Sequence, residues 1–129
     1  MSQDQLITYV KNIVPINDIE TELFISCFEE VNVKKRQFIV QPNFTNRHRT
    51  FVVTGAFRTY AVTNDGQEHT LQFAIENWWV SDFNSYIYQR PATLFIVALE
   101  DSTILQIEYS KEQELKKSNH KFETFFNFI

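Results

Sequence analysis

Residues 76–95 read ENWWVSDFNSYIYQRPATLF and contain the pattern in this chain that most resembles a binding site. A strand-like run breaks at Ser81-Asp82, passes through a short polar segment and resumes after Pro91. Chains that interrupt a strand in this way often hold an anion with backbone N–H groups of the interruption. The pattern therefore indicates recognition of a negatively charged group. The residue beside Thr93, however, is Ala92, which brings no positive charge to such a group.

The cysteine and histidine residues do not form a pattern typical of a metal centre or a catalytic nucleophile. Cys27 is the only cysteine, which excludes an internal disulfide and a cysteine-rich metal site. His48, His69 and His120 are far apart and lack the short spacings of metal-binding histidine pairs. We expect Cys27 to be a small buried hydrophobe and the histidines to lie at the surface or in hydrogen bonds, with no metal and no cofactor.

The chain has the size and composition of one globular domain. Its 129 residues are 43% apolar and include 13 phenylalanines, which is enough for a packed core. The formal net charge is −4, whereas DNA-binding surfaces are usually basic, and we interpret the basic cluster at 34–36 as a solvated turn. No apolar run reaches the about 18 residues of a membrane span, and the N-terminus lacks the layout of a secretory signal. We therefore expect a cytoplasmic protein that does not itself bind DNA.

Residues 1–30 are predicted to form two short helices. Apolar residues recur at helical spacing until Pro15 ends the first helix. Asn17 with Glu20 has the form of a capping box that begins the second helix.

Residues 31–109 are predicted to form the β-region of the domain, because apolar and polar residues there alternate with a period of two. Gly55 interrupts a long β segment and indicates a bulge or tight turn. Asn64-Asp65-Gly66 is a strong hairpin signal, and the return strand EHTLQFAI carries three apolar residues on one face. Many short strands separated by turns favour a mainly β fold, a double-stranded β-helix or jelly roll.

Residues 110–129 are predicted to form C-terminal helices, the last of them strongly apolar on one side. This face consists of Phe122, Phe125, Phe126 and Ile129, spaced i, i+3, i+4 and i+7. The helix has no stop signal after it, so we expect it to be cut short. We expect its apolar face to be exposed and to contact a second copy of the chain, although packing on the chain's own β-roll is the alternative.

These elements, and above all VVTGAFRTYAVTNDGQEHTLQFAIENWWVSD at residues 52–82, resemble the effector domain of Crp/Fnr transcription regulators. The stretch is most similar to the branch of that family common in Bacteroidetes. The resemblance implies a cyclic-nucleotide-binding jelly roll, followed in the family by a helix-turn-helix domain that reads DNA. Residues 1–129 contain no match to that second domain. In the family the long C-terminal helix also forms the dimer interface. The resemblance therefore implies a homodimer through Phe122, Phe125, Phe126 and Ile129.

The same resemblance gives the interrupted strand a specific chemistry. Family members that bind cyclic AMP open this cassette with Gly-Glu and close it with Arg followed by Ser or Thr. The Glu accepts a hydrogen bond from the ribose, and the Arg pairs with the phosphate. The corresponding residues here are Ser81, Asp82, Ala92 and Thr93. The degenerate site therefore comprises Ser81, Asp82, Phe83, Arg90, Ala92 and Thr93.

The loss of the cation at Ala92 argues against cyclic AMP as the ligand. Ser81 is expected to cap the short helix, and Asp82 is able to reach a hydroxyl, but its charge opposes a phosphate. Arg90 lies two residues upstream, and Pro91 restricts the backbone between them. We expect a sensor and dimerisation domain of a Crp/Fnr-type regulator that does not respond to cyclic AMP. A stand-alone small-molecule binder is the alternative, and a cupin-type metalloenzyme is disfavoured because clustered His and Glu ligands are missing.

Overall fold

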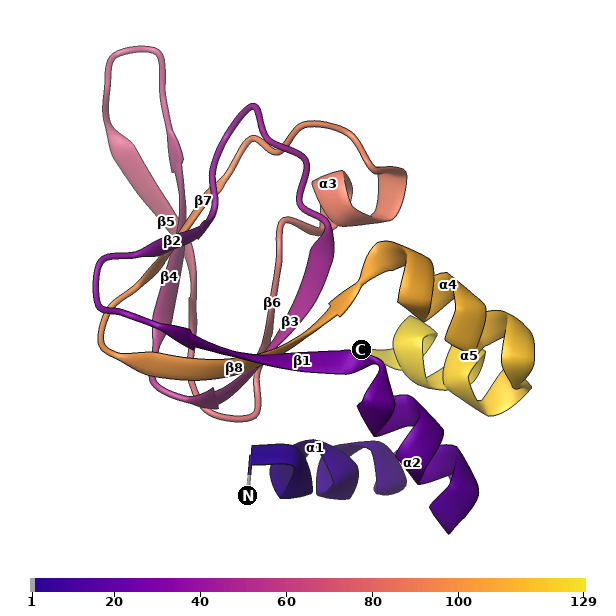
Figure 1. Cartoon of the computed structure of the whole chain (residues 1–129). Coiled ribbons are helices and arrows are strands. Elements are labelled where there is room, and N and C mark those ends of the chain that lie inside the picture. Colours follow the sequence, from indigo (N-terminus) through magenta and orange to yellow (C-terminus); the bar gives the residue numbers. More distant parts are fainter. Residues whose placement is uncertain (1) are drawn as a thin grey trace.

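The alternating segments form two four-stranded antiparallel sheets that face each other in a jelly roll, as the computed structural model of residues 2–129 shows (Figure 1). One sheet has the order β1-β8-β3-β6 and the other β2-β7-β4-β5. The predicted mainly β jelly-roll fold is therefore confirmed. The strands are β1 (Phe28–Val33), β2 (Phe38–Val40), β3 (His48–Thr54), β4 (Phe57–Val62), β5 (Glu68–Ala74), β6 (Trp79–Val80), β7 (Phe95–Ala98) and β8 (Ser102–Glu108).

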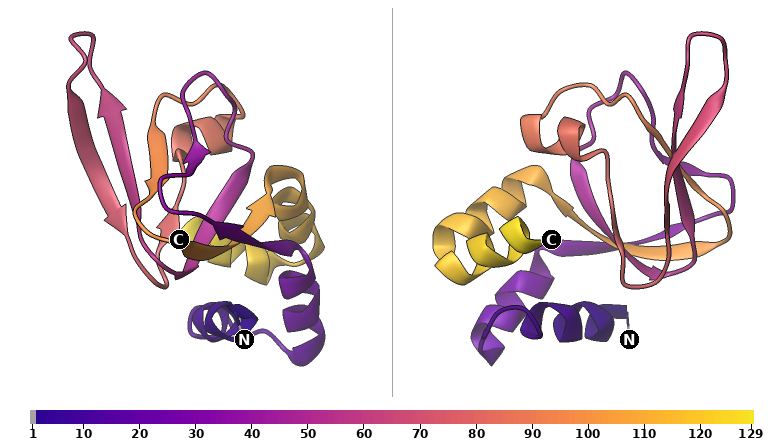
Figure 2. Two further views of the ribbon diagram at one scale, coloured as in Figure 1. Left: turned by 60° about the vertical axis from the view of Figure 1, so that its left-hand side comes forward. Right: turned by 180° about the vertical axis from the view of Figure 1, so that it is seen from behind.

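The helices gather on one side of the roll, and the β4–β5 hairpin projects from the other (Figures 1 and 2). The helices are α1 (Ser2–Lys11), α2 (Asp18–Ser26), α3 (Phe83–Tyr88), α4 (Tyr109–Ser118) and α5 (His120–Phe128). The predicted capping box begins α2, with reciprocal hydrogen bonds between Asn17 and Glu20. Strand β1 begins at Phe28, inside the segment predicted to be helical. None of the helices in the described part of the chain is long and apolar enough to cross a membrane.

The first sheet is buried on both faces because its central strands place apolar side chains on each side. Val52 of β3 and Ile104 of β8 enter the cluster inside the roll, between the two sheets. Their neighbours Phe51 and Leu105 point the other way and pack with the helices in a second cluster. Strands buried on both faces read as continuous apolar runs and not as simple alternation.

Two glycine-containing turns form where the sequence predicts them. Gly55 lies between β3 and β4 with a φ of +105°, and a Cβ atom there would collide with Ser102. Gly66, with a φ of +85°, closes the β4–β5 hairpin. Beyond this turn the apolar residues of β5 and its end share one face, but that face is open to solvent. Leu71 is 60%, Phe73 56% and Ile75 51% exposed.

The apolar face of α5 is covered by the chain itself, so the expectation of an exposed patch there is wrong. Phe122 and Phe125 are fully buried, and Phe126 is 3% exposed. All three contact the ring of Phe24 from α2 with centroid distances of 5.4–6.0 Å. A helical apolar stripe signals burial, and here the covering surface comes from the first two helices and from the chain's own roll, where the Trp79 ring lies 6.1 Å from that of Phe125. Only Ile129 of the predicted dimer residues is partly exposed.

Trp79 belongs to this helix-side cluster, whereas Trp78 does not. The Trp79 ring lies 5.0 Å from the ring of Phe51 and 6.0 Å from that of Tyr9. Trp78 is half-exposed. Trp79 is therefore a core residue, and Trp78 lies at the surface.

Candidate functional site

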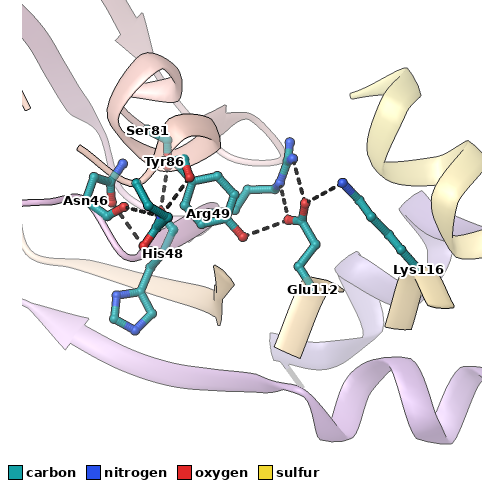
Figure 3. Close-up of polar contacts among 8 residues, drawn as sticks. Asn46, His48, Arg49, Ser81, Tyr86, Glu112 and Lys116 are labelled. Carbon is teal, nitrogen blue, oxygen red and sulfur yellow. Dashed lines mark hydrogen bonds and ion pairs between the residues drawn. The ribbon is translucent and has the colours of Figure 1, made fainter. Parts of the chain in front are cut away.

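The strand break at Ser81-Asp82 forms as predicted and leads into helix α3. Strand β6 ends at Val80, and Ser81 donates its hydroxyl hydrogen to the carbonyl of His48 at 2.8 Å (Figure 3). The prediction that Ser81 caps the helix is wrong, because Asp82 is the N-cap residue and its side chain accepts from Ser85 N–H. The chain re-enters a sheet at Phe95, after Pro91 has formed an isolated β-bridge with Thr45.

The Asp82 carboxylate is the anion held by this cassette. Its Oδ1 atom accepts from the N–H of Ser85 at 3.1 Å. Its Oδ2 atom accepts from the N–H groups of Thr93 and Leu94 at 3.0 and 3.2 Å. The side chain is 2% exposed, so these bonds replace most of the water that would otherwise solvate the charge. The backbone donors that the sequence predicts for a ligand anion are thus satisfied by a residue of the chain.

Ala92 contributes to the interior of the roll and not to a polar site. It is 3% exposed and packs in the apolar cluster between the sheets. Its backbone donates to the carbonyl of Phe44 at 2.9 Å and accepts from Asn43 at 3.0 Å. The segment is therefore anchored like a strand, and Ala92 itself places no cation beside the Asp82 carboxylate.

Arg90 points away along the surface. Its guanidinium group donates to Asn84 Oδ1 at 2.8 and 2.6 Å and lies 4.9 Å from the ring centroid of Tyr88. A surface pocket of about 390 Å³ is lined by Arg90, Asp82 and Thr93, among others. The structure thus brings these three predicted site residues together.

Ser81, Phe83 and Ala92, the other three predicted site residues, do not line this pocket.

A second polar cluster, which sequence reasoning missed, joins the roll to the C-terminal helices (Figure 3). Arg49 of β3 forms a bidentate pair with Glu112 of α4, with Nε–Oε1 and Nη2–Oε2 distances of 2.7 and 3.1 Å. The Tyr86 hydroxyl of α3 donates to Glu112 Oε1 at 2.8 Å. Lys116 Nζ lies 3.1 Å from Glu112 Oε2. The side chains of Arg49 and Glu112 are only 5% and 1% exposed, so this is a buried ion pair tied to three elements.

One signal in the sequence could have indicated this cluster. Arg49 has the same parity along β3 as Phe51 and Val53, whose side chains are buried against the helices. A cation in such a series requires a buried carboxylate as its partner. The pairing with Glu112 itself, more than sixty positions away, follows only from the tertiary structure.

The environment of Glu112 keeps its carboxyl ionised. Burial acts to raise the pKa of Glu112, but the hydrogen bonds and charge of Arg49, the Tyr86 hydroxyl and Lys116 outweigh it and lower the pKa below the ordinary value of 4.5. Burial and the neighbouring Glu112 charge raise the pKa of Tyr86 far above its ordinary value of 10.0. Tyr86 is therefore a neutral hydrogen-bond donor throughout the physiological pH range.

Lowering the pH should reduce the stability of the fold, because it protonates Glu112. Because the folded pKa of this carboxyl lies below 4.5, its ionised form contributes full stability above that value. The contribution is lost as the pH falls through the lower folded pKa. In urea titrations over a pH series, the advantage of the unmodified protein over Glu112→Gln should be constant near neutral pH and shrink in acid. An advantage that does not change with pH would contradict this origin.

The histidines do not lie in a metal-binding arrangement. Across residues 2–129, no group of three or more His, Cys, Asp or Glu side chains is placed to hold a metal ion. His48 is half-buried, and burial lowers its pKa despite the opposing charges of Glu108 and Glu29. Cys27 packs at the edge of the helix-side cluster.

Comparison with known proteins identifies a family for this chain. The family model described as "Cyclic nucleotide-binding domain" matches residues 30–119. No curated protein matches the chain in sequence.

Several solved structures share the fold at low sequence identity. The catabolite activator protein of Thermus thermophilus has a TM-score of 0.77 and 18% identity over 88% of this chain and 53% of its own. The sensor domain of the transcriptional regulator DNR from Pseudomonas aeruginosa has a TM-score of 0.78 and 14% identity over 94% and 80%. The regulatory domain of Toxoplasma gondii PKA, solved with cAMP, has a TM-score of 0.74 and 9% identity over 88% and 44%.

The chain thus spans about half of the length of the Thermus thermophilus protein. These likenesses concern regulatory and sensor domains, including regulators of Crp/Fnr type, and not a catalytic family. Because the family model covers well over half of the chain, the protein belongs to the cyclic nucleotide-binding domain family.

Proposed function

We propose that this chain is the sensor domain of a cytoplasmic Crp/Fnr-type transcription regulator whose roll does not respond to cyclic AMP. The observation that carries this proposal is the Asp82 carboxylate, which accepts the N–H groups of Ser85, Thr93 and Leu94. In this proposal the domain is not an enzyme. DNA is contacted by a helix-turn-helix domain outside residues 1–129.

A cyclic nucleotide would meet two obstacles at this cassette. Its phosphate would compete with Asp82 for the same backbone donors, each worth about 1.5–3 kcal/mol when bonded to a charged group. Two like charges about 4 Å apart repel by about 4 kcal/mol at an effective dielectric constant of about 20. Arg90 is exposed and already paired with Asn84, and exposed ion pairs contribute at most about 1 kcal/mol. Repulsion therefore exceeds what the available cation offsets.

Cyclic AMP and cyclic GMP are expected to bind the unmodified domain no tighter than millimolar, which corresponds to about −4 kcal/mol. Calorimetric titration of the purified protein with each nucleotide measures this directly. Micromolar binding would overturn the proposal. In that case Arg90→Ala identifies whether Arg90 supplies the missing cation, with Arg36→Ala, an exposed arginine outside the cassette, as the matched control.

We also propose that the domain dimerises through the solvent-facing side of α5. Phe128 is 70% exposed, in contrast to the three buried phenylalanines of this helix. Phe128→Ser should reduce self-association in sedimentation without lowering the melting temperature, because the side chain makes little contact with its own core. Ile19→Ser, at an equally exposed site on α2, serves as the control. A protein that is monomeric at high concentration would contradict the proposal.

A further inference from the structure

A pocket of about 480 Å³ lies beside the buried ion pair, outside the roll. Its walls come from α3, α4, α5 and β3, and they include the cations Arg49 and Lys116. Four aromatic rings, those of Phe83, Tyr86, Tyr109 and Phe126, line it as well. Its volume lies in the range of small-molecule sites, about 300–1,000 Å³. The cassette residues Asp82 and Thr93 line a different pocket, so the two cavities are separate.

The guanidinium of Arg49 uses one of its edges for the ion pair with Glu112. Its Nε and Nη2 atoms donate to Glu112, so the Nη1 end of the fork lies outside the contact with that carboxylate. The planar fork of arginine directs Nη1 away from a carboxylate bound along the Nε–Nη2 edge. The buried side-chain polar atoms without a partner in the described part of the chain are Thr59 Oγ1 and Trp79 Nε1, and not Arg49 Nη1, so a ligand at Nη1 replaces water in the pocket.

The charges around the pocket leave an excess of one positive charge. Arg49 and Lys116 are cations, and Glu112 is the single carboxylate among the lining residues. Tyr86 is neutral, since burial and Glu112 raise its pKa. A monoanion would balance this excess, whereas a dianion would meet Glu112 without compensation.

The aromatic walls define the rest of the ligand. The Arg49 guanidinium carbon lies 5.4–5.6 Å from the ring centroids of Phe83, Tyr86 and Phe126, so aromatic rings surround the guanidinium group. Rings prefer to stack on or pack edge-to-face against other rings. We propose that this pocket binds a small aromatic monocarboxylate, with its carboxylate at Arg49 Nη1 and Lys116 Nζ and its ring among the aromatic walls. The inference does not depend on the regulatory role proposed above.

Phenylacetate tests this assignment, with the neutral phenylacetamide as the matched probe. Methyl resonances of Ile87 and Ile129, which both line the pocket, report binding in NMR titrations, and the exposed Ile19 on α2 is the remote control. Phenylacetate should shift the two pocket methyls saturably and leave Ile19 unchanged. Phenylacetamide should bind at least about tenfold more weakly, since a charge-assisted contact is worth about 1.5–3 kcal/mol.

Substitutions distinguish a specific binding site from a non-specific apolar depression. Lys116→Gln should weaken phenylacetate about tenfold, because one charge-assisted contact is lost. Lys117→Gln, at the exposed next position of α4, should leave the affinity unchanged. Ile87→Glu, at a half-exposed position, adds a negative charge and should abolish binding without unfolding the domain. Equal affinity for acid and amide, equal effects of the two lysine substitutions, or no methyl shifts would each overturn the proposal.

Discussion

Replacing Glu112 by alanine is expected to lower the free energy of unfolding by about 3–5 kcal/mol, the usual cost of removing one partner of a buried ion pair. The substitution leaves the Arg49 guanidinium charged and buried, and it removes the acceptor of the Tyr86 hydroxyl. It also removes the contact that holds Lys116 over this cluster. Since domains of this size are stable by about 5–15 kcal/mol, a large part of the stability is lost. Denaturant unfolding measures the change.

Two further variants separate the ion pair from the helix that carries it. Glu114→Ala changes an exposed glutamate on the same helix and should alter stability by no more than about 0.5 kcal/mol. The double variant Arg49→Met with Glu112→Leu removes both charges together and should cost much less than Glu112→Ala, because no buried charge is left unpaired. If Glu112→Ala costs no more than Glu114→Ala, the pair does not stabilise the fold.

Asp82→Ala is expected to destabilise the domain by about 2–4 kcal/mol, since the carboxylate satisfies three backbone donors and caps α3. Water can reach Thr93 because it is exposed, which keeps the loss below the sum of three charge-assisted bonds. Asp82→Asn preserves the shape but turns an NH₂ group toward N–H donors, so an intermediate loss is expected. Asp18→Ala, at a fully exposed aspartate, should change stability by no more than about 0.5 kcal/mol.

The fold was predictable because local signals agreed with one another. The period-two segments, the glycine at position 55 and the Asn64–Gly66 turn each specify a local geometry, and the two sheets follow from their order. The boundaries were less predictable. Phe28 begins β1 because it pairs with Ile107 of β8, and such long-range pairing leaves little trace in one short window of sequence.

The elements that cover each buried side chain were harder to predict from the sequence. The stripe on α5 correctly indicates that Phe122 and Phe125 avoid water, yet the sequence does not say whether α2 or a second copy covers them. The apolar face of Leu71 and Phe73 shows the converse, since this periodic signal belongs to a solvent-facing side of β5. The periodic spacing of apolar residues identifies a face of a helix or strand. Only the tertiary structure shows whether that face contacts the core, a partner or solvent.

The cassette also combines features that residue types predict with one that only the tertiary structure shows. Its position, its interrupted strand and its missing cation at Ala92 follow from residue types. The role of Asp82 does not, because a carboxylate that receives a ribose hydroxyl and one that fills the anion site itself look identical in sequence. The backbone N–H groups of Thr93 and Leu94, which converge on Oδ2, distinguish them.

The central claim, that Asp82 is the resident anion of the cassette, is tested most directly by adding an external anion to Asp82→Ala. Vacated donors at Ser85, Thr93 and Leu94 should accept acetate or inorganic phosphate, and binding to the folded state raises the melting temperature. Thermal unfolding of Asp82→Ala should therefore be shifted upward by millimolar acetate or phosphate, measured against chloride at equal ionic strength. The unmodified protein, whose donors are occupied, should show no such shift. Equal shifts in both proteins, or none in the variant, would contradict the claim.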